Sequence, residues 1–398
     1  MPYMHFSAPE LEHHPHIYHI SPEAHHLGAA RHNRPKESPR IEPPDFRFCV
    51  ELGLVIRSRK RNHKNAIDLA EEVKAQLTRA GIANHIADSR TSPVSSREWS
   101  IAREGCIPDR PQDHRFGMKL VSPFMRFSKR PESWQSQLRT VFHTLNIYFE
   151  LTTSHQCYTH INIIPDSGFW KLSEAKGLAK SALYFERCLD ALVPPYRQRS
   201  VWAKSNRHNH YFENMRMEAC FARIDEQNDC VALGARMNLC SSMSPTGVAL
   251  GVPPGRDFQH DTFRWSFIGL NEGEGFGPIA FRQPPGSTSS SEVISWVMLV
   301  VCLARLSCGA ELTLNPLAKP QLKSLGEWLI YESEWTQVPH RSLLKNLINQ
   351  AVPISLAPQA GKDADVITID EDRRLRETEK DRDLVLEKYR RLLKHVYI

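Results

Sequence analysis

Four short segments that lie far apart in the chain alternate apolar and polar residues in the manner of strands from one sheet. Side chains two residues apart on a strand point to the same face, so this alternation gives each strand one apolar and one polar face. A common core under the apolar faces would bring the polar residues together on the opposite side. The segments are FRFCVELGLVI around Glu51, FGMKLVSPFM around Lys119, THINII around His160 and GPIAFRQPPGS around Arg282.

The first of these strands carries a single acid on its polar face. Glu51 and Gly53 share that face, whereas Val50, Leu52 and Leu54 share the other. Two carboxylates so spaced would suit Mg²⁺, which prefers oxygen ligands and usually bridges carboxylates to substrate phosphates. Only one of the two positions is an acid here.

The remaining segments add polar residues to the same predicted face. Residues 99–123 predict a strand, a polar loop containing Gly105 and Pro108, and a second strand. Two consecutive prolines after Arg282 end the last strand. The residues that share a face are His160 with Asn162, and Ala280 with Arg282.

In order and spacing these motifs resemble the amidoligase family, which is related to glutamine synthetase and glutamate-cysteine ligase. No single motif is strong, but five follow one another in the family order. The resemblance runs from Phe46 to Ser307. The matching positions are Glu51, Trp99, Gly105, Ile107, Gly117, Val121, Ser122, Pro123, Cys157, His160, Phe281, Arg282, Gln283, Pro285 and Gly286, with Glu186 and Arg197 on the family's helix and its following arginine.

The departures from the family pattern concern its charged residues. Gly53, Lys119 and Ala280 stand where the pattern has glutamates. Asn162 replaces its second histidine, and Glu104 replaces an aspartate conservatively. Three of the four strand carboxylates are therefore absent.

The resemblance implies an ATP-dependent enzyme that activates a carboxylate as an acyl phosphate, which an amine then attacks to give an amide. Its substrates would be a small carboxylic acid or amino acid and an amine, and its cofactors would be ATP and Mg²⁺. Metal ions and arginines neutralise the moving phosphoryl group in such reactions. The implied roles are metal binding for Glu51 and Glu104, catalysis for Arg282, His160 and Lys119, and nucleotide or anion binding for Arg197, Arg282 and Lys119.

Lys119 is the substitution with the largest electrostatic consequence. Unit charges about 4 Å apart interact by roughly 4 kcal/mol at an effective dielectric of about 20, so an ammonium would repel a divalent ion by about twice that. One hypothesis is a rebuilt site, in which Lys119 and Arg282 hold an anion while Glu51 and Glu104 keep at most one Mg²⁺. The alternative is a catalytically degenerate member that serves as a binding or scaffold protein.

Each candidate residue also has a purely structural interpretation. Glu51 and Arg282 could be members of structural ion pairs, and His160 could be a core histidine whose hydrogen bonds are satisfied. Lys119 could extend from a strand end to solvent. All four nevertheless occupy family positions, so the sequence favours a structural role for all four together less than for any one of them.

Helical segments between the strands predict an α+β fold, mainly an antiparallel sheet covered by helices as in the catalytic domain of glutamine synthetase-like enzymes. A short strand is expected at 84–89, and one or two strands with a loop at 228–261. GEGFG at 273–277 is expected to close a hairpin. Helices are expected at 66–82, 134–149, 174–192, 293–304 and 320–348.

Composition divides the chain into a main body and two tails. The first 45 residues are rich in His and Pro with little apolar periodicity, which predicts disorder, although histidine clusters can bind metals. The last segment alternates opposite charges at helical spacing, typical of a helix that docks on the body or binds a partner. The predicted organisation is a tail at 1–45, an amidoligase-like domain at 46–310, a helical extension at 311–356, a linker at 357–371 and a charged helix at 372–398.

Charge and cysteine content favour a cytoplasmic protein without nucleic-acid or membrane partners. The net charge is only +6, and the basic run RSRKRNHK at 57–64 fits a solvated loop better than a nucleic-acid patch or nuclear signal. Nine cysteines show no C-x-x-C pair, which favours a reducing compartment. The longest apolar run, at 293–304, is too short to span a bilayer, and no secretory signal is recognisable.

Overall fold

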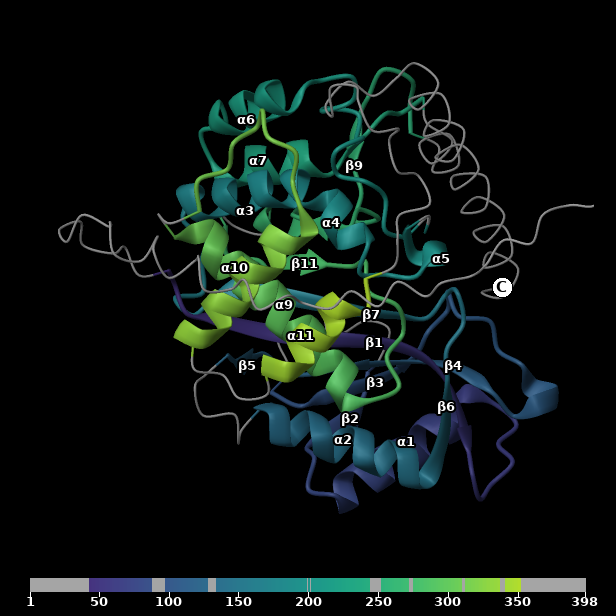
Figure 1. Cartoon of the computed structure of the whole chain (residues 1–398). Helices are drawn as coiled ribbons and strands as arrows, with labels where there is room; N and C mark the ends of the chain where they lie inside the picture. Colours follow the sequence, from purple (N-terminus) through teal and green to yellow (C-terminus); the bar gives the residue numbers. More distant parts are fainter. Residues whose placement is uncertain are drawn as a thin grey trace, which may run out of the picture. The chain divides into compact units, whose positions relative to one another are not determined.

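The computed structural model describes residues 43–87, 97–127, 134–198, 200, 202–243, 252–271, 275–309, 312–336 and 341–351, all of which lie in one compact unit, Glu42–Ile398 (Figure 1). The predicted linker at 357–371 and charged helix at 372–398 lie outside the described residues, as does all but the end of the predicted tail at 1–45. The predicted GEGFG hairpin at 273–277 is also only partly inside them. The predicted domain boundaries stay predictions.

Within the described residues, nine strands form one sheet, with the order β10-β11-β7-β1-β4-β3-β2 and with β5 and β6 also paired to β1. All pairs are antiparallel except β2 with β3. The predicted α+β class with a mainly antiparallel sheet is therefore confirmed. The strands are β1 Phe46–Ser58, β2 Asn84–Ile86, β3 Trp99–Arg103, β4 Phe116–Val121, β5 Met125–Arg126, β6 Phe149–Thr152, β7 Tyr158–Pro165, β10 Trp265–Ser266 and β11 Ile279–Phe281; β8 Leu239–Cys240 and β9 Phe258–Gln259 form a separate pair.

β1 lies at the centre of the sheet and sets the register of its neighbours. Glu51 faces His160 on β7 and Val121 on β4. Gly53, two residues further, faces Tyr158 on β7 and Lys119 on β4. Directly paired residues point to the same face of a sheet, so the predicted polar positions share one face.

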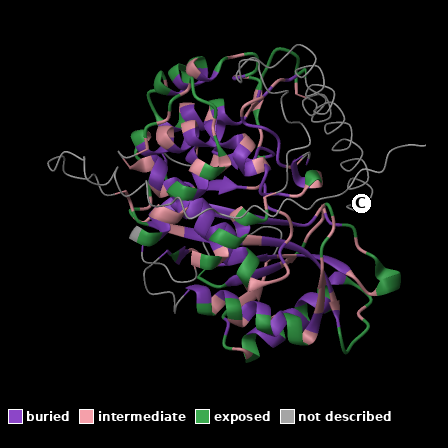
Figure 2. Cartoon of the chain, in the orientation of Figure 1, coloured by how far each residue is buried: buried purple, intermediate pink, exposed green. Residues whose placement is uncertain are grey.

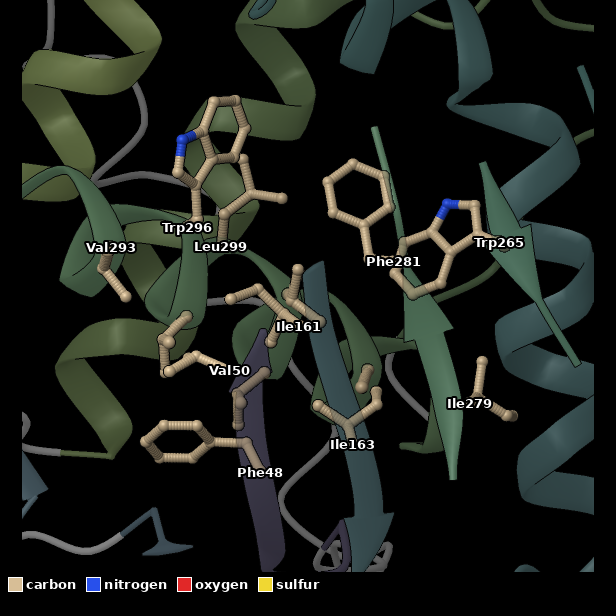
Figure 3. Close-up of a cluster of buried hydrophobic side chains, with 14 of the residues drawn as sticks. Phe48, Val50, Ile161, Ile163, Trp265, Ile279, Phe281, Val293, Trp296 and Leu299 are labelled. Atoms are coloured by element: carbon tan, nitrogen blue, oxygen red, sulfur yellow. The ribbon is translucent and has the colours of Figure 1, made fainter. Parts of the chain in front are cut away.

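The opposite face of the sheet is apolar and covered by helices. Figure 3 shows Val50 of β1, Ile161 of β7 and Phe281 of β11 grouped with Trp296 of helix α9. All four are at most 4% exposed, and Figure 2 colours most of the central strands of the sheet as buried. Burying this face is the main stabilising contribution to the fold, and it leaves the other face free for polar side chains.

The predicted helices at 66–82 and 134–149 are confirmed as α1 Ala66–Arg79 and α2 Trp134–Tyr148. The helix predicted at 174–192 is wrong as a single element, because the chain leaves helical geometry at Phe185 (φ −90°, ψ 6°) between α3 Leu172–Tyr184 and α4 Glu186–Asp190. The region predicted at 320–348 is also two helices. The others are α5 Pro195–Gln198, α6 Met217–Asp225, α7 Cys230–Met237, α9 Ser290–Cys308, α10 Leu322–Trp335 and α11 Arg341–Asn349.

The segment predicted as strand and loop at 228–261 begins instead with helix α7. Asp229 caps this helix by accepting a hydrogen bond from Ala232 N at 2.6 Å. Its buried residues recur at helical spacing, at Cys230, Leu233 and Met237. The predicted strands follow only afterwards, as β8 and β9.

Helix α9 is longer than the apolar run that predicted it. By length and composition alone, this 19-residue helix is long and apolar enough to cross a membrane. However, 72% of its most apolar 18-residue stretch is buried inside the molecule. Ser289 begins it with a capping box, in which Ser289 Oγ accepts from Glu292 N and Glu292 reaches back to Ser289 N. The burial of most of this apolar stretch is typical of a core helix.

Candidate functional site

Glu51 and His160 form the centre of the polar face, because β1 and β7 place them directly opposite each other. Glu51 Oε2 lies 3.9 Å from His160 Nδ1, and Glu51 Oε1 accepts a hydrogen bond from Asn162 Nδ2 at 2.9 Å. Within the described residues, neither ring nitrogen of His160 has a hydrogen-bond partner, although the residue is only 3% exposed. Leaving buried polar atoms without a hydrogen bond costs free energy, so we expect the ring nitrogens to hydrogen-bond to a ligand or to water.

Arg282 follows β11 directly and extends the same polar row. The β11 register pairs Ala280 with Asn162 and Phe281 with Ile161, so Arg282 comes next, beside His160. Its Nη1 lies 3.4 Å from Asp261 Oδ2, and its Nε has no hydrogen-bond partner in the described part of the chain.

Arg197 supports the backbone behind Arg282. Its side chain is fully buried, and it donates from Nη2 to the carbonyl oxygen of Arg282 at 2.6 Å and from Nε to that of Gln283 at 2.9 Å. Burial lowers the pKa of Arg197 to about 10, which still leaves the guanidinium charged at neutral pH. The role of Arg197 as an anion clamp stays a prediction; in the structure its guanidinium contacts the backbone at the end of β11.

The electrostatics of the central pair give one ionised acid beside one neutral imidazole. Burial alone would raise the pKa of Glu51, but its contact with His160, the Arg282 charge and the Asn162 amide together lower it to about 2. Burial and the Arg282 guanidinium lower the pKa of His160 to about 3, although Glu51 opposes them. At neutral pH, Glu51 is therefore charged and His160 is neutral.

Tyr158 links this pair to Glu104. Its ring stacks on His160 with centroids 4.0 Å apart and planes inclined by 16°, and its hydroxyl donates to Glu104 Oε2. The other oxygen of Glu104, Oε1, accepts from Cys106 N at 3.2 Å. Burial, together with the carboxylates of Glu104 and Glu51, raises the pKa of Tyr158 well above 10, so the phenol stays protonated.

Gly53 and Lys119 occupy two positions where the predicted family pattern has acids. A Cβ at Gly53 would lie 2.5 Å from Tyr158 Cε1, so the ring fills the space that a side chain at residue 53 would use. Lys119 lies on the same face, opposite Gly53 on β4, and is partly exposed. Tyr158, Gly53 and Lys119 thus form one row across three strands.

The residues present do not fit a Mg²⁺ ion held by the protein. The contacts that connect the two predicted ligands run from Glu51 to the His160 ring, to the stacked Tyr158 ring and on to Glu104, and three of the four carboxylate oxygens accept hydrogen bonds. Within the described ranges, no three His, Cys, Asp or Glu side chains come together to hold a metal ion. Lys119 adds a positive charge to the same face.

Sequence reasoning missed the structural roles of Tyr158 and Asp261. Tyr158 sits two positions before His160, and this period of two is a signal that could have placed it on the polar face. Asp261 lies in a segment without strand periodicity, and nothing in the sequence indicated its contact with Arg282.

Comparison with known proteins agrees with the motif order. A family model described as "Putative amidoligase enzyme" matches residues 44–304, which is more than half of the chain. Among curated proteins, no match was found. The match spans the whole sheet, from β1 through β11, and most of helix α9. The chain belongs to the amidoligase family.

Proposed function

We propose that the protein is an ATP-dependent carboxylate-amine ligase with an altered metal site, which joins a small carboxylic acid or amino acid to an amine. The observation that carries this proposal is the meeting of an ionised Glu51, a neutral His160 and Arg282 on the polar face of the sheet. Family membership supports amide-bond formation as the reaction. The proposal includes a fold related to the catalytic domain of glutamine synthetase.

In the proposed reaction ATP supplies the phosphoryl group that activates the acid. A carboxylate oxygen of the acid bonds to the γ-phosphorus, and ADP leaves; the amine nitrogen then bonds to the acyl carbon, and phosphate leaves as the amine loses a proton. Arg282 binds the anionic oxygens, because its planar fork of donors suits phosphate and carboxylate groups. Neutral His160 donates one hydrogen bond and accepts another, and Lys119 adds positive charge.

Other residues of the chain hold this arrangement in place. Asn162 fixes the Glu51 carboxylate through its 2.9 Å hydrogen bond. Arg197 fixes the backbone from which Arg282 extends, through two hydrogen bonds to carbonyl oxygens. Such supports keep a site within the narrow tolerance that catalysis requires.

A second candidate is a catalytically degenerate member of the family that binds a ligand or serves as a scaffold. The observation that favours it is the Tyr158 ring above Gly53, which takes the place of an acid side chain. This candidate predicts nucleotide or substrate binding without turnover.

The deciding experiment measures conversion of ATP to ADP and phosphate by the full chain, with mixtures of amino acids and amines. We expect ADP formation that requires both an acid and an amine, and that falls by about a hundredfold or more in Arg282→Lys, as is usual when a charge-stabilising donor is lost. Arg223→Lys, an exposed arginine on α6, serves as the control and should leave the rate unchanged. Binding without turnover would favour the second candidate, and no nucleotide binding at all would refute the ligase.

A further inference from the structure

We infer that this site binds its oxyanion without a divalent cation held by the protein, and that Tyr158 fills the volume that a second carboxylate would otherwise occupy. The inference concerns the same site as the proposed function and deepens it. It predicts which class of ligand the free protein accepts: phosphate-type oxyanions directly, and no isolated Mg²⁺ or Mn²⁺.

The first step of the argument is the volume above Gly53. The ring of Tyr158 lies so close that the nearest three ring atoms would be 2.5, 2.7 and 2.8 Å from a Cβ at that residue. Real Cβ atoms do not approach other atoms this closely, so an acid at residue 53 would require the Tyr158 ring to leave its present position. The Tyr158 ring therefore occupies the space in which a carboxylate at residue 53 could supply a ligand oxygen.

The second step is the state of the two remaining acids. Glu104 accepts hydrogen bonds on both oxygens, from the Tyr158 hydroxyl and from Cys106 N. Glu51 accepts one from the Asn162 amide, a neutral donor that satisfies an oxygen that a metal would otherwise coordinate. Each carboxylate oxygen has about two lone-pair sites, so each of these hydrogen bonds leaves its oxygen one site for a cation instead of two.

The third step is the set of groups that stay available for an anion. Among the described residues, both ring nitrogens of His160 and Nε of Arg282 are buried without a hydrogen-bond partner. His160 is 3% exposed and lies in the register position beside Arg282. Lys119, partly exposed on the same face, adds a cation. A neutral imidazole carries one N–H, so His160 offers an oxyanion one donor, and Arg282 and Lys119 supply the positive charge that it requires.

A titration of the full chain with Mn²⁺ alone tests the absence of a resident cation site. We expect no binding at micromolar Mn²⁺, measured by electron paramagnetic resonance of the free ion. Stoichiometric micromolar binding that disappears in Glu51→Gln would overturn the inference.

Calorimetry with inorganic pyrophosphate in the presence of EDTA tests direct oxyanion binding. We expect binding that Arg282→Lys weakens about tenfold or more, because the variant loses the planar fork of charged donors that suits phosphate oxygens. Arg305→Lys is a matched control, since its side chain is 14% exposed against 16% for Arg282 and also pairs with a carboxylate. Pyrophosphate binding that is detected only when Mg²⁺ is added would overturn the inference.

A rebuilt acid tests the assignment to Tyr158. The triple variant Gly53→Glu, Lys119→Gln, Tyr158→Ala restores a carboxylate in the vacated volume, and the double variant Lys119→Gln, Tyr158→Ala is its control. With thermal melting showing that both fold, we expect Mn²⁺ to bind the triple variant at least tenfold more tightly than the double variant. Equal Mn²⁺ affinity in the two folded variants would overturn the assignment.

The outcomes separate this inference from the proposed function. Pyrophosphate binding in EDTA without any ATP turnover would support the inference and refute the ligase. Turnover combined with a micromolar Mn²⁺ site in the free protein would support the ligase and refute the inference.

Discussion

The ring of Tyr158 lies against the backbone of Gly53 on the polar face of the sheet, in the space that a side chain at residue 53 would occupy. They are register partners on β7 and β1, and Lys119 on β4 completes the row. An acid at residue 53 would therefore need the Tyr158 ring to move, or a smaller residue at 158. The change at Gly53 is coupled to its neighbour and is more than the loss of one ligand.

Gly53→Ala should destabilise the fold, because the added methyl group meets Tyr158 Cε1 at 2.5 Å. Overpacking of this kind costs about 1–3 kcal/mol in the free energy of unfolding. Urea denaturation measures it, and Gly309→Ala, where the nearest atom is 3.4 Å away, should be close to neutral. Adding Tyr158→Leu should recover part of the loss in a double-mutant cycle, whereas a neutral Gly53→Ala would contradict the close packing of Tyr158 on Gly53.

The central strands could be predicted from sequence because their faces differ so sharply. Val50, Leu52 and Leu54 are fully buried and alternate with Glu51 and Gly53, as a period of two requires. The pattern failed where distant contacts decide the backbone. Glu186 begins α4 after the break at Phe185, and its buried carboxylate contacts Arg264 at 2.8 Å, a partner that no local pattern contains.

The candidate site was predictable to a similar degree. The common face of Glu51, His160 and Arg282 follows from strand periodicity, whereas the register that sets Glu51 opposite His160 was not predicted and comes from the structure. The Tyr158 ring above Gly53 did not follow, because the contact joins residues 105 positions apart and depends on a rotamer. The sequence therefore showed which acids are missing, but not that the Tyr158 ring fills the space above Gly53.

Arg197→Lys should loosen the end of β11. The Arg197 guanidinium donates hydrogen bonds to two successive carbonyl oxygens, those of Arg282 and Gln283. A lysine ammonium is a compact point charge and cannot make both hydrogen bonds with good geometry. We expect a loss of about 2–4 kcal/mol in the free energy of unfolding, because a buried charge and a carbonyl are left poorly paired. Pyrophosphate binding should weaken as well, since Arg282 shifts. Unchanged binding in a folded variant would show that Arg197 does not position Arg282.

Asp261→Asn should strengthen oxyanion binding. The Asp261 carboxylate is 3.4 Å from Arg282 Nη1 and 55% exposed, so it competes with an anionic ligand for the guanidinium. Exposed ion pairs contribute about 0–1 kcal/mol, which corresponds to up to about a fivefold gain in pyrophosphate affinity. Asp257→Asn is the control, because that acid lies just before β9, whereas Asp261 follows it, and it pairs with His210 instead of Arg282. Weaker binding in Asp261→Asn would mean that Asp261 holds Arg282 in place.

His160 should make the fold sensitive to acid. Its pKa falls from 6.5 in an ordinary histidine to about 3 in the folded protein, so between these values the unfolded chain binds a proton that the folded protein does not. Stability contributed by this group is thus complete above about pH 6.5 and decreases as the pH falls toward 3, by at most about 1.4 kcal/mol per pH unit. Urea denaturation from pH 7 to 4.5 should show a shallower decrease for His160→Gln than for the wild type, and no such change for His143→Gln, an exposed residue on α2. Parallel curves for wild type and His160→Gln would show that His160 takes up its proton in the folded state, and with it that the site holds an imidazolium beside Glu51.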